Sequence, residues 1–129
     1  MGVPERPASH TQCLLFVYGS LKRGQANHRE LSAARFIATV RTAPTFALRD
    51  IAGYPALVPG DRAISGELYE LPRQSLPRLD EFEGEGYLRE TIELAGGVEA
   101  LAYIAREPGL GTPLSLDEWP ALANPTRAG

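Results

Sequence analysis

An unbroken apolar segment runs from residue 14 to residue 18 and stops at Gly19. Consecutive apolar side chains leave neither face of a strand polar, which is typical of a strand buried on both faces. The segment therefore predicts the central strand of a sheet. The polar residues that follow, 22–26, predict a loop.

A short helix and a series of strands are predicted next. Asn27 is followed three residues later by Glu30, which is the spacing of a capping box, so a short helix is expected over residues 27–34. Turns rich in Gly, Pro and Asp then bound four stretches with strand-like composition. These are residues 35–42, 45–49, 56–58 and 63–71.

A second helix is expected over residues 75–82. Ser75 suits its N-cap, and Pro77 is tolerated because it would lie in the first turn. Gly84 or Gly86 would end the helix, because glycine readily adopts the left-handed conformation found after helix C-termini.

The clearest local pattern is a β-hairpin near the end of the chain. Residues 87–94 and 98–106 are strand-like, and Ala95-Gly96-Gly97 lies between them. A Gly-Gly pair supplies the positive φ angles of a tight turn. Beyond the hairpin, a segment rich in Pro and Gly holds the only tryptophan, Trp119, which we expect to pack over an open end of the sheet.

Length and composition describe one globular domain. The chain has 129 residues, of which 43% are hydrophobic and 22% charged. We expect a flexible leader over residues 1–12, a single domain over residues 13–120 and a C-terminal tail over residues 121–129. Because no apolar run is long enough for a signal peptide or a membrane span, a cytoplasmic protein is expected.

Charge and metal-binding residue types narrow the expected partners. Thirteen Lys and Arg against 16 Asp and Glu give a net charge of −3, without the basic stripe that a phosphate backbone requires. Nucleic acid is therefore not an expected partner. Cys13 is the only cysteine, and His10 and His28 are the only histidines, so a structural zinc site or other metal site is not expected.

The turn Tyr18-Gly19-Ser20-Leu21 is the first candidate for chemistry. Successive backbone N–H groups at the end of a buried strand can bind a carboxylate or a developing oxyanion, and glycine allows a ligand to approach the backbone. The alternative is an ordinary strand-to-loop turn in which Gly19 serves only the backbone geometry.

The second candidate is the acidic end of the second predicted helix, which holds Asp80, Glu81, Glu83 and Glu85. Negative charge at a helix C-terminus opposes the macrodipole, so helix stability does not explain the cluster. A carboxylate carried into a partly buried place has a raised pKa, which suits a general base near neutral pH. The alternative is a solvated acidic helix end beside a Gly-rich loop.

Two rival arrangements carry less weight. Ser20 and His28 could imitate a hydrolase triad, but the Gly-x-Ser-x-Gly elbow is missing and His28 is expected on the surface of the short helix. Cys13 has no neighbour in sequence that would lower its pKa, so it is expected to be a core residue. The phosphate-loop and dinucleotide-binding glycine patterns are both missing.

Several segments of the sequence, in the order expected for the family, resemble the gamma-glutamylcyclotransferase-like superfamily. The resemblance is strongest to its short AIG2-like and gamma-glutamylamine cyclotransferase branch. The resemblance covers about residues 14–106. The matching segments are LFVYGSLKRG at residues 15–24 with Asn27-His28, YPALVPG at 54–60, GELYEL at 66–71, LDEFEG at 79–84, Tyr87 with Arg89, and Ala102-Tyr103.

This resemblance implies an α+β fold, a small mixed β-barrel of about six strands with two short helices. It also implies a reaction in which the α-amine of the substrate attacks its own γ-glutamyl carbonyl and releases 5-oxoproline. Glu83 matches the catalytic glutamate of the family, residues 18–21 match its binding loop, and Tyr87 is a further expected substrate-binding residue. No cofactor is implied.

The expected substrate is a small γ-glutamyl amine or dipeptide. The segment 84–86 between Glu83 and Tyr87 is shorter than in many enzymes of the family, which alters one wall of the expected pocket. Without a basic cluster near the loop, glutathione, which carries a second carboxylate, is expected to be a poorer substrate. A non-catalytic small-molecule binding module of the same fold is the alternative.

Overall fold

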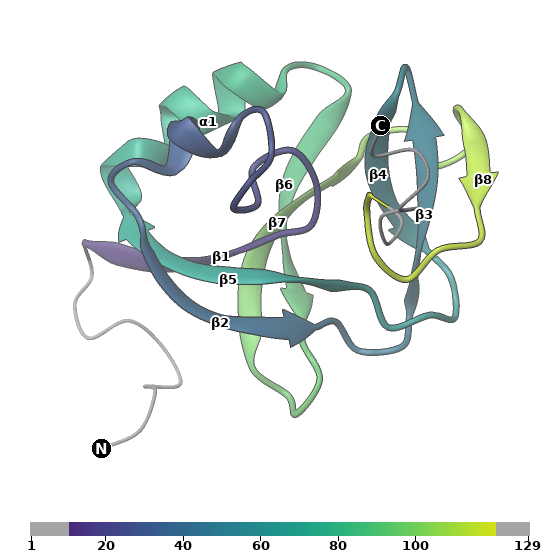
Figure 1. Ribbon diagram of the computed structural model, residues 1–129, viewed down its shortest axis with the longest axis horizontal. Coiled ribbons are helices and arrows are strands. Elements are labelled where there is room, and N and C mark those ends of the chain that lie inside the picture. The colour runs from purple at the N-terminus through teal and green to yellow at the C-terminus, as the bar shows by residue number, and fades with distance from the viewer. Residues whose placement is uncertain (1–10, 121–129) are drawn as a thin grey trace.

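The computed structural model describes residues 11–120 (Figure 1). The predicted leader and tail fall almost entirely outside these residues, and the first strand already begins at Gln12. The strands are β1 (Gln12–Val17), β2 (Arg35–Arg41), β3 (Phe46–Ile51), β4 (Tyr54–Pro59), β5 (Ser65–Pro72), β6 (Tyr87–Glu93), β7 (Glu99–Ala105) and β8 (Thr112–Leu114). The helical segments are η1 (His28–Leu31), η2 (Arg73–Ser75) and α1 (Leu76–Glu83).

The apolar segment near the N-terminus forms a central strand, as predicted. β1 pairs antiparallel with β5 along its whole length and parallel with β7 at Leu15 and Leu101. From Cys13 to Val17 every residue of β1 is buried. The two sheet faces beside β1 are therefore both covered, which is why the sequence here has no polar alternation.

The sheet is mixed, with strand order β2-β5-β1-β7-β4-β3-β8 and with β6 paired to β7. β7 pairs with three strands. β6 is antiparallel to it over its full length, while β1 and β4 are each parallel to it at a single position, Leu101 and Ile104 respectively. Since a strand has only two edges, β1 and β4 share one edge of β7.

The expected barrel of about six strands is therefore corrected to an eight-stranded sheet that is not a closed barrel. Within residues 11–120, the ends of β2 and β6 meet at an isolated bridge between Thr42 and Leu94. The remaining strands β4, β3 and β8 extend from the shared edge of β7 and do not return to β2 (Figure 1). The eighth strand, β8, carries Pro113 and forms because it pairs with β3.

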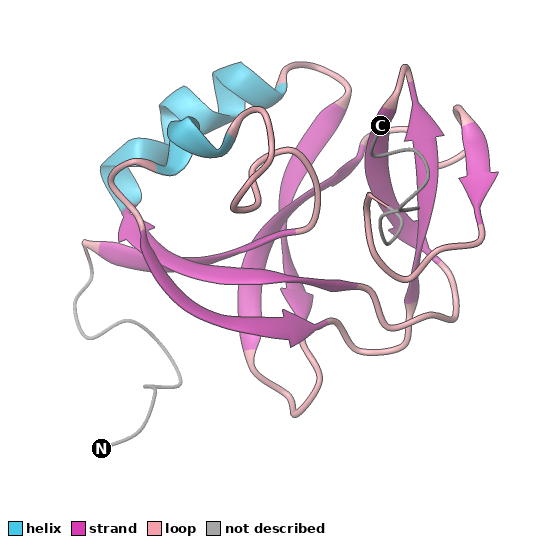
Figure 2. Cartoon of the chain, viewed as in Figure 1, coloured by secondary structure: helices cyan, strands magenta, loops and turns pink. Residues whose placement is uncertain are grey.

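The helices agree with prediction in place but not in capping. α1 covers the expected segment and ends at Gly84, whose φ is 81°. The side chains of Ser75 and Asn27 make no cap hydrogen bond, and the first predicted helix is only the 3-10 segment η1. Asn27 donates from its Nδ2 to Ser20 Oγ at 2.9 Å, so its side chain fixes the preceding loop instead. Figure 2 shows the helical segments gathered on one side of the sheet.

The Gly-Gly hairpin is confirmed. β6 and β7 pair from Tyr87 with Ala105 to Glu93 with Glu99, and Gly96 and Gly97 have φ angles of 90° and 91°. Trp119 packs, partly buried, against the core cluster that contains residues of β1, β5 and β7.

Gly66 in β5 generates a stability prediction. A Cβ atom at this position would lie 2.6 Å from Phe16 Cζ and would also contact the carbonyl oxygen of Val17. The neighbouring backbone cannot give way without moving β1, so we expect Gly66→Ala to lower the free energy of unfolding by about 1–3 kcal/mol in chemical denaturation. Gly109→Ala is the control, because nothing lies within 4 Å of its Cβ position, and it should remain within about 0.5 kcal/mol of the wild type.

Candidate functional site

A cavity of about 360 Å³ opens between the end of β1 and the end of α1. This volume lies within the range of small-molecule sites. Its lining combines residues 16–21 and Asn27 with Tyr54 and Pro55 of β4, Phe82 and Glu83 of α1, Tyr87 of β6 and Tyr103 of β7. All six residues that the sequence singled out, Tyr18, Gly19, Ser20, Leu21, Glu83 and Tyr87, are therefore brought together in one cavity.

Tyr18 directly follows β1, at the point where β1 and β4 diverge from the edge of β7 that they share. Its hydroxyl donates to the carbonyl oxygen of Tyr103 in β7 at 2.6 Å and accepts from the backbone N–H of Leu57 in β4 at 3.0 Å. The hydroxyl thus satisfies two backbone groups at the point where the ladder is interrupted. Burial raises the pKa of Tyr18 well above its ordinary value, so it stays protonated and keeps this role.

The loop after Tyr18 is held by its own hydrogen bonds. The N–H of Lys22 donates to Gly19 O at 3.0 Å, and the backbone N–H of Asn27 donates to Ser20 O at 3.0 Å. Within residues 11–120, the backbone N–H groups of Gly19, Ser20 and Leu21 have no protein acceptor. Three donors at the end of a buried strand are thus free to bind an anionic oxygen.

Gly19 owes its identity to packing against β4. A Cβ atom here would lie 2.8 Å from Pro55 Cγ and 4.0 Å from Trp119 Cε3. The sequence interpretation assigned this glycine to close ligand approach. The structure adds that any larger residue would push the loop away from Pro55, which itself lines the cavity.

Glu83 is the last residue of α1 and the only acidic residue that lines the cavity. Burial raises the pKa of its carboxyl group from 4.5 to about 7. Among residues 11–120, no Lys, Arg or His lines the cavity, so none of their charges offsets this desolvation. Near neutral pH the group is therefore divided between its acid and base forms, which suits proton transfer in either direction.

Tyr87 stands beside this carboxyl group and ties β6 to β4. Its hydroxyl donates to Pro55 O at 2.9 Å. Burial, and then the negative charges of Glu83 and Asp50, raise the pKa of Tyr87 to about 12. The hydroxyl is therefore a fixed neutral donor at the cavity wall.

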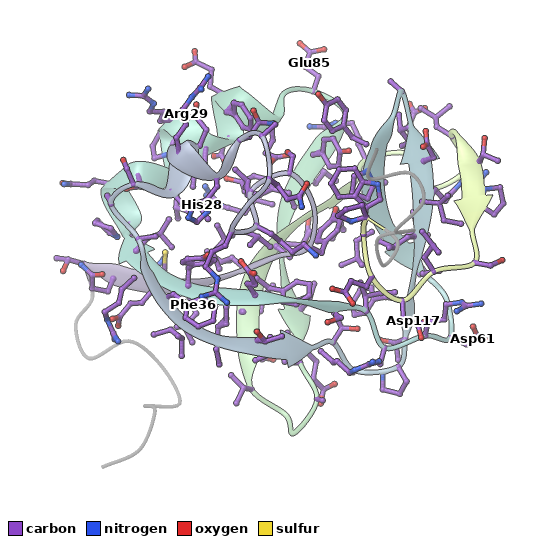
Figure 3. All side chains as sticks on the ribbon, in the orientation of Figure 1. His28, Arg29, Phe36, Asp61, Glu85 and Asp117 are labelled. Atoms are coloured by element: carbon purple, nitrogen blue, oxygen red, sulfur yellow. The ribbon has the colours of Figure 1, made fainter. Side chains whose placement is uncertain are left out.

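The other carboxylates of the acidic helix end are turned to other contacts. Asp80 accepts from Arg89 Nη1 at 2.8 Å and from the Tyr103 hydroxyl at 2.7 Å. Glu81 and Glu85 are exposed, and Figure 3 shows Glu85 pointing away from the fold. Of the four carboxylates that drew attention in the sequence, only Glu83 faces the cavity.

The rival arrangements are not assembled. His28 Nδ1 lies 2.9 Å from Leu21 O, and the Ser20 hydroxyl oxygen accepts from Asn27 instead of from a catalytic base. Burial raises the pKa of the Cys13 thiol, which contacts Leu71 O, so this cysteine is a core residue. Among residues 11–120, no three His, Cys, Asp or Glu side chains gather into a possible metal site.

Comparisons with known proteins identify the family of this chain. The family model described as gamma-glutamyl cyclotransferase, AIG2-like matches residues 15–121, which include every lining residue of the cavity. The chain belongs to this family. The resemblance inferred from the sequence is confirmed, and the protein is a cyclotransferase enzyme.

Individual relatives support the same assignment. A Vibrio cholerae protein provisionally named a gamma-glutamylcyclotransferase is 39% identical over 98 residues, covering 74% of this chain and 84% of that protein. The gamma-glutamylaminecyclotransferase A of Danio rerio is 37% identical over 92 residues, covering 62% and 57%. The crystal structure of an AIG2-like protein from Mus musculus matches with a TM-score of 0.66 and 31% identity, covering 75% of this chain and 79% of that one.

Several cavity residues of this cyclotransferase were not assigned a role from the sequence. Tyr54, Pro55, Phe82 and Tyr103 lay in segments that carried the resemblance, and so did Asn27, which was expected to cap a helix. Phe82 at the end of α1 and Tyr54 at the start of β4 were a usable signal in the sequence, because a large apolar ring beside a polar turn can mark a binding surface.

No helix within residues 11–120 is long and apolar enough to cross a membrane.

The raised pKa of Glu83 predicts a pH-dependent stability. The folded state holds the Glu83 proton up to about pH 7 and the unfolded chain only to about pH 4.5. The stability that this group contributes is therefore full below pH 4.5 and is lost as the pH rises to 7. Glu83→Gln mimics the protonated acid. At pH 8 it should therefore be more stable than the wild type by about 1–3 kcal/mol in denaturant unfolding.

At pH 4.5 the same variant should match the wild type. Glu81→Gln, at an exposed position of the same helix, is the control and should follow the wild type at both pH values. A Glu83→Gln protein that is less stable than the wild type at pH 8 would contradict the proposed burial of an unpaired carboxyl group.

Proposed function

We propose that this enzyme converts a small γ-glutamyl amine or dipeptide to 5-oxoproline and a free amine, with Glu83 as general base and then general acid. The observation that supports this most is a single carboxyl group, with a pKa of about 7, in a cavity also lined by three residues whose backbone N–H groups have no acceptor within residues 11–120. An acid and base of this kind is what an intramolecular aminolysis needs.

The reaction begins with proton removal. The α-ammonium group of the substrate gives one proton to the Glu83 carboxylate, which leaves a neutral nitrogen with its lone pair. That nitrogen attacks the γ-carbonyl carbon, so a new C–N bond closes a five-membered ring and the carbonyl oxygen takes negative charge. As the carbonyl re-forms and the original C–N bond breaks, Glu83 gives its proton to the leaving nitrogen. The ring nitrogen still carries two hydrogens and loses the second one through Glu83 to the released amine. The net change is substrate to 5-oxoproline plus the amine in its ammonium form.

The loop after β1 holds the substrate for this closure. The amides of Gly19, Ser20 and Leu21 can bind the α-carboxylate or the developing oxyanion on the γ-carbonyl. Because both reacting groups belong to one molecule, much of the lowering of the barrier comes from fixing its folded conformation. The bonds from Asn27 to Ser20 keep the loop in place before the substrate arrives.

In a binding module, an ionised Glu83 could pair with the α-ammonium group of the ligand, but a pKa of about 7 leaves this carboxyl group only partly ionised near neutral pH. A protein that only held a zwitterionic γ-glutamyl compound would gain from a cation near its carboxylate and would lose stability at pH 7 by burying an unpaired acid. The cavity has the unpaired acid and lacks the cation. This favours catalysis.

The preference for small amines over glutathione is supported by the positions of the nearby cations. Lys22 is buried and paired with Glu118 at 3.9 Å. Arg23 lies 3.6 Å from Glu67, and Arg89 is bound to Asp80. None of the three lines the cavity, so the glycine carboxylate of glutathione would have no partner there. The name of the Danio rerio relative likewise refers to γ-glutamylamines.

We expect Glu83→Gln to lower 5-oxoproline formation at least about a thousandfold, because the amide keeps the shape of the side chain but cannot accept a proton. Release of 5-oxoproline from a γ-glutamyl amine is measured by chromatography. In the wild type, kcat/KM should rise with pH and reach half of its maximum near pH 7 as Glu83 ionises.

Glu81→Gln and Glu85→Gln are matched controls on the same helix end, and both should retain activity within about threefold of the wild type because their side chains are exposed. Activity of Glu83→Gln within a few-fold of the wild type would rule out this glutamate as the acid and base. Loss of activity in a control instead would move the role to that residue.

A side-by-side rate measurement tests the substrate class. We expect kcat/KM for a γ-glutamyl derivative of a simple amine to exceed that for glutathione by at least about tenfold, since binding glutathione would leave a carboxylate without a charge partner. If glutathione is turned over fastest, the preference is refuted while the reaction itself stands.

A further inference from the structure

Large apolar side chains that remain exposed gather at the mouth of the cavity. In the described part of the chain, three large hydrophobic residues are exposed, Tyr54 at 50%, Phe82 at 39% and Leu110 at 51%. Two of them, Tyr54 and Phe82, also line the cavity, although they come from different elements, the start of β4 and the last turn of α1. Exposed apolar surface that borders a cavity commonly marks a binding surface.

The positions of the Tyr54 and Phe82 rings relate them to the leaving group of the substrate, the amine that is released. The leaving nitrogen must come within hydrogen-bond reach of Glu83 to receive its proton. Phe82 directly precedes Glu83, and Tyr54 precedes Pro55, whose carbonyl oxygen anchors Tyr87 beside the same carboxyl group. The γ-glutamyl part must turn inward toward the loop amides, so the group carried by the leaving nitrogen extends toward the two rings.

The charges that line the cavity determine which kind of leaving group would bind beside Tyr54 and Phe82. Among residues 11–120, Glu83 is the only charged side chain that lines the cavity, and its charge when ionised is negative. A carboxylate on the leaving group would meet no cation, whereas an apolar or aromatic group would cover ring surface that is otherwise exposed to water.

We propose that Tyr54 and Phe82 form a leaving-group subsite that selects amines bearing an apolar or aromatic group. This inference rests on the proposed function, because it takes Glu83 as the group that protonates the leaving nitrogen. It adds two specificity residues and a chemical class for the amine.

The test compares two substrates that differ only in the leaving amine, γ-glutamylbenzylamide and γ-glutamylmethylamide. We expect the wild type to show a kcat/KM about tenfold or more higher for the benzylamide. In Tyr54→Ala and in Phe82→Ala, the ratio of the two kcat/KM values should fall to about twofold or less. The ratio is the decisive quantity, since damage to the neighbouring Glu83 would lower both rates together and leave it unchanged.

Leu110→Ala is the matched control, because Leu110 is equally exposed but does not line the cavity. Its ratio should equal that of the wild type. The subsite is overturned if the wild type turns over both amides at the same kcat/KM, if the alanine variants keep the full ratio, or if γ-glutamylalanine or a γ-glutamyl diamine is turned over faster than the benzylamide.

Binding to the Glu83→Gln protein separates this inference from the reaction. By titration calorimetry, the benzylamide should bind this protein about tenfold more tightly than the methylamide, and adding Tyr54→Ala should remove the difference. If the difference is present but the wild type releases no 5-oxoproline from either amide, the proposed reaction fails and the subsite stands. If the difference is missing, the subsite fails whatever the wild type does with the two amides.

Discussion

The interruption of pairing along one edge of β7 is the constraint on which the site depends. β1 pairs with this edge at Leu101 and β4 pairs with it at Ile104, so two strands diverge from neighbouring positions. Backbone groups at such a fork would be left buried without partners, at a cost of about 1–3 kcal/mol each. The Tyr18 hydroxyl resolves this by joining the Tyr103 carbonyl to the Leu57 amide. The same fork separates β1 from β4 and leaves room between them for a cavity.

The electrostatics of the cavity follow from what surrounds it. Hydroxyl groups of Tyr18 and Tyr87 are already committed to backbone partners, and Arg89 is committed to Asp80. Glu83 is thus left beside neutral groups, and burial alone raises its pKa. Asp80, three residues earlier in the same helix, is paired with Arg89, whereas Glu83 makes no ion pair within residues 11–120.

The sequence predicted best those elements whose structure is determined by residues close together in the chain. The apolar run of β1, the Gly-Gly hairpin and the end of α1 at Gly84 depend on residues adjacent in the chain. The open eight-stranded sheet was missed because β8 has a proline and no strand pattern, and it forms only through pairing with a distant strand. The capping roles given to Asn27 and Ser75 failed for a similar reason, since Asn27 finds a better-placed partner in Ser20. Glu83 was predicted from the family resemblance. The sequence does not show that Arg89 and Tyr103, on two other strands, bind Asp80 and not Glu83.

The loop of free amides is held from several directions, and this is what a preorganised oxyanion or carboxylate site requires. Asn27 binds it from the following turn, Pro55 of β4 packs against Gly19, and the ring of Trp119 lies near the same glycine. The segment that carries Trp119 is itself tied to the body of the fold, because Asp117 accepts from the Ser65 amide and from Arg62, and Glu118 pairs with buried Lys22. Figure 3 places Asp117 close to the strands of the sheet. The end of the described chain therefore packs beside the loop without lining the cavity, and the position of the loop depends on packing between β1, β4 and a segment about one hundred residues away.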